Sequence, residues 1–411
     1  MHVLVVTQYF WPENFRINDL CTELVARGHK VTVLTGVPNY PQGSVLPEFK
    51  QNPQEFLEYY GVEIIRVPIL ARGKVSSIKL ILNYISYALS ASTIGLFKLR
   101  KHKIDVVFVC QLSPITIALP AVLYRKIYQK PVVMWVLDLW PESLLSVGVI
   151  KSKFVLRLIG RLVSFIYKRC DLILGQSKAF YKGISLYCDD VKKIKYFPSW
   201  SEDVFLEKKY SPVALLKESN DDYFKIMFTG NIGEAQDFPA IVQSAEMIKV
   251  IDAKIKFFIV GDGRAVNWLQ AAIRDKELED YIYLLGRHPL EKMPIFYESA
   301  DALLVSLKQS TVFSMTIPGK VQSYMASGKP ILTMLSGEGS RVVDEASCGF
   351  TADSGDYEKL TSNIIQMSLL TVDELRDFGK KARQYSDKEF SRDKLVDQLE
   401  AWLENIKLEG R

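Results

Sequence analysis

The sequence predicts an α/β protein of two domains, each with a parallel β-sheet covered by helices. Three observations favour this fold class. The chain has 411 residues, and domains typically contain about 100–200. Short runs rich in β-branched residues alternate with longer helical patterns, the order that gives parallel sheets buried on both faces. This alternation stops near residues 198–222 and then starts again with a new strand.

The first domain is expected over residues 1–200 and starts directly with a strand. Its expected strands are Val3–Val6, Lys30–Leu34, Glu63–Val67, Ile104–Val109, Pro131–Val136 and Asp171–Leu174. Helical patterns cover Asn14–Arg27 and Ile115–Gln129, and Gly28 stands where a helix-terminating glycine belongs. Met1 is followed neither by a basic segment nor by a long apolar one, so no signal peptide is predicted.

The second domain is expected over residues 223–386. Turn-forming and charged residues at Phe197–Ser201 and Lys217–Asp222 separate it from the first, and Val213–Leu216 suggests a short buried helical turn. Its expected strands are Tyr223–Thr229, Ile255–Val260, Tyr281–Leu285, Ala302–Val305 and Pro330–Met334. An amphipathic helix over residues 387–411 either caps this domain or crosses back to the first.

The composition excludes several classes of protein. Hydrophobic residues make up 48% of the chain and aromatic residues 11%, which is enough to form cores and is not typical of disordered chains. The five cysteines are widely spaced and form no C-x-x-C motif. We therefore expect neither a disulfide framework nor a cysteine-based zinc site, and a reducing cytosol fits this pattern best.

The net charge of +5 hides a difference between the two halves. Residues 1–200 contain 26 basic and 13 acidic side chains, whereas residues 201–411 contain 26 and 34. Two segments, Lys74–Lys103 and Lys151–Arg169, combine positive charge with apolar stretches. We expect them to bind an anionic membrane surface, because each basic residue near such a surface contributes about 1 kcal/mol. Nucleic acid is not the expected partner, since no binding motif is present.

Each of these segments also has a second interpretation. Leu80–Phe97 has no charged residue and reaches the lower limit for a membrane span, but its polar residues favour a helix at the membrane interface or one buried between domains. In the other segment one helical stripe is basic: Lys153, Arg157, Arg161 and Lys168. The apolar residues on its other side would fit against the protein's own sheet, leaving the stripe either solvated or in contact with the membrane.

Three glycine-bearing turns follow strands of the second domain. They are Gly230–Gly233, Gly261–Gly263 and Gly286–His288. Ligands of open α/β sheets bind beyond the carboxyl ends of the strands, where glycine lets the backbone approach a phosphate. Glycine after a strand is also common in simple turns, and none of the three is a complete dinucleotide-binding motif or a P-loop. Together they predict a phosphate-bearing ligand at this edge of the sheet.

The most specific feature is the segment Thr316–Ile331. Pro318 is expected to open a helix and Gly328 to end it. Lys320 would then lie in the first turn, where its charge opposes the helix dipole unless an anion is bound nearby. A solvated surface lysine is the alternative interpretation.

Several motifs together resemble those of the GT-B glycosyltransferases of family 4, in the O-antigen and capsule branch that includes N-acetyl-L-fucosamine transferases. They follow the family's order over nearly the whole chain: Pro12–Arg16, Arg27–Thr35, Pro38–Gly43, Asp138–Ser143, Gly230–Gln236, Gly261–Gly263 and the segment around Lys320. The resemblance implies two Rossmann-like α/β domains whose parallel sheets face a central cleft. It also implies a retaining transferase without a tightly bound cofactor or metal, and the chain has no D-x-D motif.

From this resemblance we expect a cytoplasmic enzyme, peripheral at the inner face of the cytoplasmic membrane. It would transfer N-acetyl-L-fucosamine, or a related amino sugar, from a UDP-linked donor to a polyprenyl-diphosphate-linked saccharide of O-antigen or capsule. The second domain would bind the nucleotide-sugar and the first the acceptor. The alternatives are a GT-B enzyme that acts on a soluble sugar and a non-catalytic binding protein of the same shape.

The chain departs from the family's pattern at the donor site. Met315 and Ser323 stand where many members have two glutamates, which leaves open whether a glutamate contacts the donor ribose. Many members also have Arg and Lys after the first glycine of the second domain, where this chain has asparagine and glutamine. Lys320 is then the first candidate for the positive charge at the diphosphate, and Arg16 the second.

The expected site residues have three roles. Donor-binding residues are Arg16, Gly230, Asn231, Gly233, Gly261, Gly263, Arg287, His288, Lys320 and Ser323. Lys320 is also expected to act in catalysis by meeting the negative charge of the leaving diphosphate. Asp138 is the candidate base, with helix capping as its alternative role and the leaving phosphate as an alternative base. Glu13 is the third candidate catalytic residue and is expected to orient sugar hydroxyls. Glu142 and Asn14 are expected to contact the acceptor. Glu13 and Glu142 could each instead be a simple surface charge.

Overall fold

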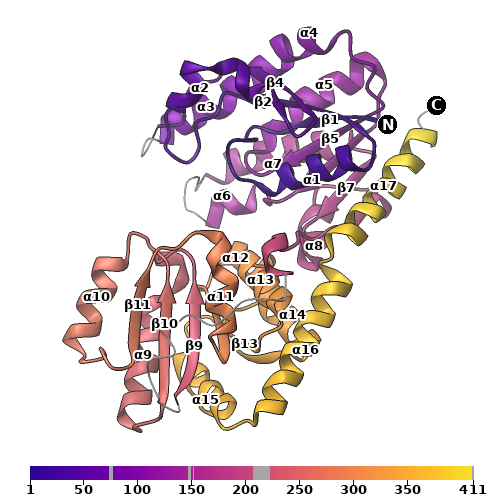
Figure 1. Ribbon diagram of the computed structural model, residues 1–411. Coiled ribbons are helices and arrows are strands. Elements are labelled where there is room, and N and C mark those ends of the chain that lie inside the picture. The colour runs from indigo at the N-terminus through magenta and orange to yellow at the C-terminus, as the bar shows by residue number, and fades with distance from the viewer. Residues whose placement is uncertain (74–76, 147–149, 151, 207–222, 410–411) are drawn as a thin grey trace. The chain divides into compact units, whose positions relative to one another are not determined.

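The structure of the chain is a computed structural model that describes residues 1–73, 77–146, 150, 152–206 and 223–409. It divides into two compact units, one formed by Met1–Pro198 with Asp393–Arg411 and the other by Ser199–Arg392. Each unit has its own mainly parallel sheet with helices (Figure 1). The predicted α/β class with two parallel sheets is confirmed.

Some sequence predictions fall on residues outside this description. They are the buried turn at Val213–Leu216, the charged stretch Lys217–Asp222, and the flanking lysines Lys74 and Lys151.

The first unit contains an eight-stranded sheet with the order β3-β4-β2-β1-β5-β6-β7-β8. Its strands are β1 (His2–Val6), β2 (Lys30–Gly36), β3 (Glu58–Tyr59), β4 (Val62–Val67), β5 (Val106–Gln111), β6 (Val132–Val136), β7 (Leu172–Gly175) and β8 (Ile194–Tyr196). β3 pairs antiparallel with β4, and the remaining neighbours pair in parallel. All of β1 is buried, as expected for the central strand of a sheet covered on both faces.

Helices of the first unit connect these strands. They are α1 (Arg16–Ala26), α2 (Pro47–Gln51), α3 (Ser77–Ser90), α4 (Leu96–Leu99), α5 (Leu119–Tyr128), α6 (Glu142–Ser146), α7 (Lys153–Tyr167) and α8 (Lys178–Ser185). A π-helical stretch at Ala91–Gly95 joins α3 to α4, and a 3-10 turn at Ile115–Ala118 precedes α5. Gly28 follows α1 with φ +85°, a conformation that favours glycine and ends the helix as predicted.

The second unit contains a six-stranded parallel sheet with the order β11-β10-β9-β12-β13-β14. Its strands are β9 (Phe224–Thr229), β10 (Ile255–Val260), β11 (Ile282–Gly286), β12 (Ala302–Ser306), β13 (Ile331–Met334) and β14 (Gly349–Ala352). Side chains of β9 alternate between two hydrophobic clusters, with Ile226 and Phe228 in one and Met227 in the other. Both faces of this sheet are therefore buried.

The helices of the second unit are α9 (Phe238–Val250), α10 (Val266–Asp275), α11 (Met293–Glu298), α12 (Thr311–Met315), α13 (Gly319–Ser327), α14 (Glu338–Ala346), α15 (Tyr357–Ser368) and α16 (Val372–Glu389). In both units the strands predicted from the sequence lie within two residues of the observed ones. The short strands β3, β8 and β14 were not predicted.

The C-terminal helix predicted over residues 387–411 begins later than expected. α16 ends at Glu389, and a separate helix, α17 (Arg392–Glu409), follows it. The reason is Phe390, which is only 2% exposed and packs into the core of the second unit with its ring 5.7 Å from that of Tyr385. The chain must leave the helical path to bury this ring.

α17 contacts the first unit, to which its residues from Asp393 onward belong. The guanidinium of Arg27 binds the carboxylates of Asp397 and Glu400. At the far end, Lys407 Nζ lies 3.1 Å from Asp105 Oδ1. Apolar residues of α17 are buried as well, including Leu399 and Leu403.

The helix that runs from α3 to α4 packs against the first unit with one face only. Asn83 and Tyr87 are fully buried on that face, and the Tyr87 hydroxyl donates to the Leu34 carbonyl oxygen at 3.0 Å. The opposite face exposes a run of apolar side chains, which we call the α3 stripe: Ile78, Ile81, Leu82, Ile85 and Leu89. Residues Ile78–Leu99 are long and apolar enough to cross a membrane by length and composition alone.

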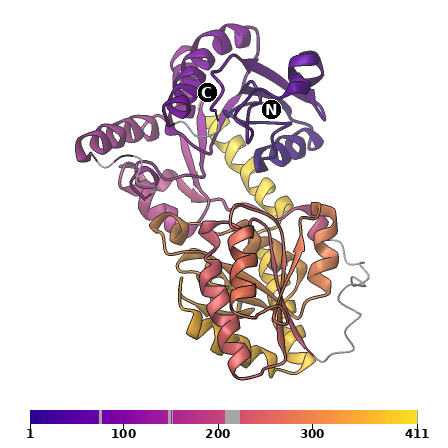
Figure 2. The same ribbon diagram turned by 90° about the vertical axis from the view of Figure 1, so that its left-hand side faces the viewer.

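α7 is exposed over its first turns. The sequence allowed its apolar side to pack on the protein's own sheet, and this holds for Val163 and Ile166, which are fully buried. It does not hold for Val155 and Leu158, which are 37% and 45% exposed. Figure 2 shows this helix extending outward from the body of the first unit.

Candidate active site

The three glycine-bearing turns of the second unit lie together at one edge of its sheet. They follow β9, β10 and β11, which are adjacent strands. The Gly230 N–H donates to the Val260 carbonyl oxygen, and the Gly261 N–H to that of Gly286, both at 2.8 Å. The Ile232 N–H donates to the Asp262 carbonyl oxygen at the same distance. The turns therefore form one hydrogen-bonded rim beyond the carboxyl ends of the strands.

Two glycines of this rim are required by its packing. A Cβ at Gly261 would lie 1.8 Å from the carbonyl oxygen of Gly230, and a Cβ at Gly263 would lie 2.2 Å from that of Ile232. Both distances are far shorter than any contact that a side chain tolerates, and the obstructing atoms belong to backbone. Only glycine lets these two turns approach each other so closely.

The rim encloses a pocket of about 460 Å³. Its lining residues are Gly230, Asn231, Val260, Gly261, Asp262, Gly263, Arg287, His288 and Met293. Arg287 is exposed, and the His288 ring packs 4.8 Å from that of Phe296. Most of the donor-binding residues predicted from the sequence are thus gathered in one pocket. Gly233 is not among its lining residues, and a Cβ there would lie 2.4 Å from Asn231 Nδ2.

Lys320 lies beside this pocket at the start of α13. Its ammonium nitrogen is 3.6 Å from the centroid of the Phe228 ring and next to Gly230, which lines the pocket. Burial lowers the pKa of Lys320 to about 7. Among the described residues no carboxylate pairs with this amine. A partly desolvated cation without an anionic partner is suited to bind an anionic ligand.

A hydroxyl network holds α13 against β9 at this site. The Tyr324 hydroxyl accepts a hydrogen bond from the Thr229 N–H at 3.0 Å, and the Thr229 hydroxyl lies 3.0 Å from that of Tyr297. All three groups are buried. The network fixes the end of β9 to the helix that carries Lys320, and so it positions the lysine beside the glycine turns.

Ser323 has a carboxylate neighbour that the sequence did not predict. Its hydroxyl donates to Glu202 Oε2 at 3.4 Å, although the two residues are 121 positions apart. Glu202 lies in the turn-rich segment between the two domains, where no motif or periodicity marks it. The Glu202 carboxylate therefore lies next to Ser323. In the family that the sequence resembles, many members have a glutamate at the position of Ser323.

In the first unit, Asp138 follows β6 and is held by its neighbours. The indole N–H of Trp140 donates to Asp138 Oδ2 at 2.9 Å, and the nearby hydroxyls of Ser113 and Ser143 act to lower the pKa of this carboxyl. Burial raises the pKa of Asp138 despite these donors. A fixed carboxylate with a raised pKa at the carboxyl end of a parallel strand has the properties of a general base.

Glu13, another predicted site residue, is buried and bound to backbone N–H groups. The residue is 4% exposed, and its Oε1 accepts hydrogen bonds from the N–H groups of Asn39 at 2.8 Å and Tyr40 at 2.7 Å. Its Oε2 accepts from the Phe10 N–H at 3.3 Å. Burial raises the pKa of Glu13 to about 7, against the opposing effect of these donors. Both oxygens are engaged with backbone, so the geometry favours a structural anchor over contact with a sugar.

The other predicted residues of the first unit have separate surroundings. Arg16 forms an ion pair with Asp19 at 2.9 Å, and Asn14 is exposed. Glu142 begins α6, and its Oε1 accepts a hydrogen bond from the Tyr187 hydroxyl at 3.0 Å. Within the described part of the chain, no group of three His, Cys, Asp or Glu side chains is placed to hold a metal ion.

Comparison with known proteins shows similarity to glycosyltransferases. Residues 223–369 match the family described as glycosyl transferases group 1. The chain is 27% identical over 268 residues to WbjE of Pseudomonas aeruginosa, which is named as a glycosyltransferase; the match covers 62% of this chain and 65% of WbjE. It is 25% identical over 345 residues to WcaI of Escherichia coli K12, named for a glycosyl transferase of colanic acid biosynthesis, with 80% and 82% of the two chains covered.

The fold has close counterparts among solved structures. One is the crystal structure of HepE from Anabaena in complex with UDP and glucose. It superposes with a TM-score of 0.68 over 98% of this chain and 99% of HepE, at 12% sequence identity. At this identity the similarity establishes the fold alone.

Proposed function

We propose a reaction for this chain, which has the GT-B fold and carries a group 1 glycosyltransferase domain at residues 223–369. The chain transfers a sugar from a nucleotide-sugar to a polyprenyl-diphosphate-linked saccharide. The name of WcaI, which refers to colanic acid, supports a role in the synthesis of a surface polysaccharide such as O-antigen or capsule.

The observation that carries this proposal is the position of Lys320. Its unpaired amine adjoins a rim of three glycine turns whose backbone is open to a phosphate. The diphosphate of a nucleotide-sugar would supply the anionic partner that this amine does not have. The diphosphate becomes more negative as the bond to the sugar breaks. UDP is the nucleotide that we propose, because HepE, which shares the fold, was crystallised with UDP.

Two carboxylates complete the proposed machinery. Asp138 accepts the proton of the attacking hydroxyl, since burial raises its pKa toward that of an efficient base. Glu202 binds the donor ribose beside Ser323, in place of the glutamate that many family members have at that position. Retention of configuration is part of the proposal through the family resemblance.

The acceptor's lipid requires a membrane, and the α3 stripe supports this location. Ile78 and Leu89 at its two ends are 71% and 63% exposed, and a run of neighbouring exposed apolar side chains is typical of an interaction surface. Lys98 and Arg100 lie at the C-terminal end of α4, which continues this helix. Apolar side chains with nearby cations favour binding at the surface of an anionic bilayer, so we propose a peripheral enzyme at the inner face of the cytoplasmic membrane.

The test has two stages. Nucleotide-sugars are first screened for thermal stabilisation of the chain, because a ligand that binds the native state raises the melting temperature. UDP-linked amino sugars, including UDP-N-acetyl-L-fucosamine, are expected to give the largest shifts. The best donor is then incubated with synthetic prenyl-diphosphate sugars and, separately, with free sugars.

Transfer to the prenyl-diphosphate acceptor alone supports the proposal. Equal transfer to free sugars favours a GT-B enzyme for soluble acceptors. Donor binding without transfer or donor hydrolysis favours a non-catalytic protein, and the absence of any stabilising nucleotide-sugar contradicts the proposal altogether.

A further inference from the structure

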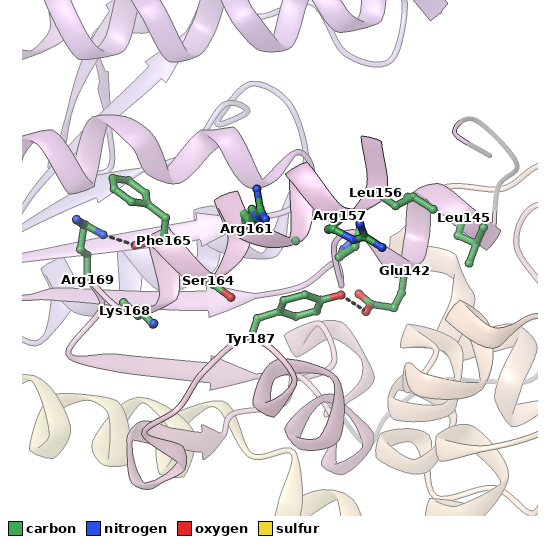
Figure 3. Close-up of a pocket in the computed structure, with 12 residues that line it drawn as sticks. Glu142, Leu145, Leu156, Arg157, Arg161, Ser164, Phe165, Lys168, Arg169 and Tyr187 are labelled. Atoms are coloured by element: carbon green, nitrogen blue, oxygen red, sulfur yellow. Dashed lines mark hydrogen bonds between the residues drawn. The ribbon is translucent and has the colours of Figure 1, made fainter. Parts of the chain in front are cut away.

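A groove of about 740 Å³ lies on the first unit. Its lining residues are Pro141, Glu142, Leu145, Leu156, Arg157, Gly160, Arg161, Ser164, Phe165, Lys168, Arg169 and Tyr187. α7 contributes half of them, and α6 contributes Glu142 and Leu145 (Figure 3). The volume is in the range of pockets that hold a small organic ligand.

The middle of the groove is built around Tyr187. Gly160 leaves room for its ring, since a Cβ at that position would lie 2.9 Å from Tyr187 Cε1. The Tyr187 hydroxyl donates to Glu142 Oε1 at 3.0 Å, and Figure 3 shows this bond joining the ring to α6. The bond fixes the one carboxylate among the lining residues on the α6 side.

The charge of the groove is mainly positive. Arg157 and Arg161 are exposed, and no ion pair or hydrogen bond of their guanidinium groups occurs among the residues that the structure describes. Lys168 pairs with Asp189 at 3.1 Å, at an exposed position. Arg169 donates to the Phe165 carbonyl oxygen at 2.8 Å and stacks on the Phe165 ring. Arg157 and Arg161 are therefore the cations that are available to a ligand.

Apolar side chains adjoin these cations. Leu145 and Phe165 line the groove and are 57% and 41% exposed. On the same helix, Phe154 and Leu158 are 67% and 45% exposed. A ligand with an anionic head and an apolar chain matches this combination, whereas a free anion would leave the apolar surface in water.

The groove is also connected to the candidate base. Its wall α6 begins at Glu142, four residues after Asp138 in the chain. A saccharide attached to a head group in the groove would start beside the loop that carries Asp138.

We propose that this groove binds the diphosphate of the lipid-linked acceptor, with Arg157 and Arg161 as its phosphate contacts. The inference rests on the proposed function and assigns the acceptor's diphosphate to named residues. Guanidinium groups bind phosphate oxygens in a bidentate manner, which suits two arginines one helical turn apart.

The test measures binding of farnesyl diphosphate to the full chain in solution by calorimetry, without any membrane. The double variant Arg157→Gln/Arg161→Gln is compared with Lys126→Gln/Lys182→Gln, which removes two exposed charges of the same unit outside the groove. We expect the groove variant to bind about tenfold or more weakly, and the control to bind within about twofold of the unmodified chain. UDP-glucose binding should be unchanged in both.

Inorganic pyrophosphate and farnesol separate the sources of affinity. Each is expected to bind at least about tenfold more weakly than farnesyl diphosphate, because each lacks one half of the ligand. Equal binding of pyrophosphate would overturn the proposal in favour of a general anion site, and equal binding of farnesol in favour of an apolar one. Unchanged farnesyl diphosphate binding by the groove variant would overturn it directly.

These outcomes are distinct from failure of the proposed function. If the chain transfers sugar to the lipid acceptor and the groove variant has an unchanged acceptor KM, the inference fails while the function stands. If the groove variant alone loses farnesyl diphosphate binding but the unmodified chain transfers nothing, the groove assignment stands while the function fails.

Discussion

Lys320 occupies the space that a side chain at position 230 would need. A Cβ at Gly230 would lie 2.7 Å from Lys320 Cε and 3.2 Å from its Nζ. The lysine chain thus runs past the first glycine turn and ends over the Phe228 ring, 3.6 Å from its centroid. This arrangement places an ammonium group beside backbone N–H groups, the two kinds of donor that a diphosphate requires.

Donor affinity should depend on pH through this amine. Burial sets the pKa of Lys320 at about 7 in the free protein, and a bound diphosphate must raise it. The amine is charged below pH 7, so binding of UDP-glucose should be tightest there. Above pH 7 binding must take up a proton, and the affinity should fall by up to about tenfold per pH unit.

Calorimetry between pH 6 and 9 checks this dependence. The variant Lys320→Gln should bind more weakly at pH 6 and show no such slope. A flat profile for the unmodified chain would mean that the amine does not contact the donor.

Replacing a glycine of the rim by alanine should be costly at Gly261 and much less costly at Gly286. Gly261→Ala places a Cβ against backbone and should destabilise the chain by more than about 3 kcal/mol. Gly286→Ala is the matched control, because its φ of +72° is strained for alanine but no atom lies within 4 Å of the new Cβ. Its cost should be about 1 kcal/mol. Urea unfolding measures both, and equal stabilities would contradict the packing described for the rim.

The strands and the main glycine turns could be predicted from the sequence because their signals are local. Runs such as Val3–Val6 and Ile255–Val260 are β-branched, buried and bounded by turns. The strands that were missed have two to four residues, too few to show a period. The break at Phe390 was missed because no glycine or proline marks it, and only tertiary packing removes that ring from water.

The site was predictable where a motif carried it. The turns at Gly230 and Gly261 and the helix start at Lys320 follow from their own neighbours in the sequence. Glu202 was not predictable, because its relation to Ser323 arises only when residues 121 positions apart fold together. The backbone contacts of Glu13 were not predictable, because two of its partners, Asn39 and Tyr40, lie in a different loop.

The carboxylates of Asp138 and Glu13 should respond differently when each is replaced by its neutral amide. Asp138→Asn retains an oxygen that can accept the Trp140 hydrogen bond, so the chain should stay folded while the transfer rate falls by about 10²–10⁴. Glu13→Gln places an amide N–H₂ against a backbone donor and should lower stability by about 1–3 kcal/mol.

Unfolding curves and single-turnover transfer rates separate these effects. If Asp138→Asn keeps full activity, Asp138 is not the base, and the leaving phosphate is the group that removes the proton.

Membrane binding should depend on the α3 stripe. Ile81 and Ile85 are 49% and 47% exposed, so Ile81→Glu/Ile85→Glu should leave the fold intact. Each isoleucine that enters the bilayer contributes about 1.5–3 kcal/mol to binding. The affinity of the double variant for phosphatidylglycerol vesicles should therefore be lower by about tenfold or more. Leu369→Glu is the control, at a residue of the second unit that is 80% exposed. If the unmodified chain and both variants float equally with the vesicles, the α3 stripe does not bind the membrane.

An experimental structure of the chain with bound UDP tests the central claim most directly. We expect the diphosphate to lie within hydrogen-bond distance of Lys320 Nζ and of the backbone N–H group of Asn231 or Gly233, with the ribose beside Glu202. A nucleotide bound elsewhere, with Lys320 still over the Phe228 ring and no phosphate near it, would contradict the claim.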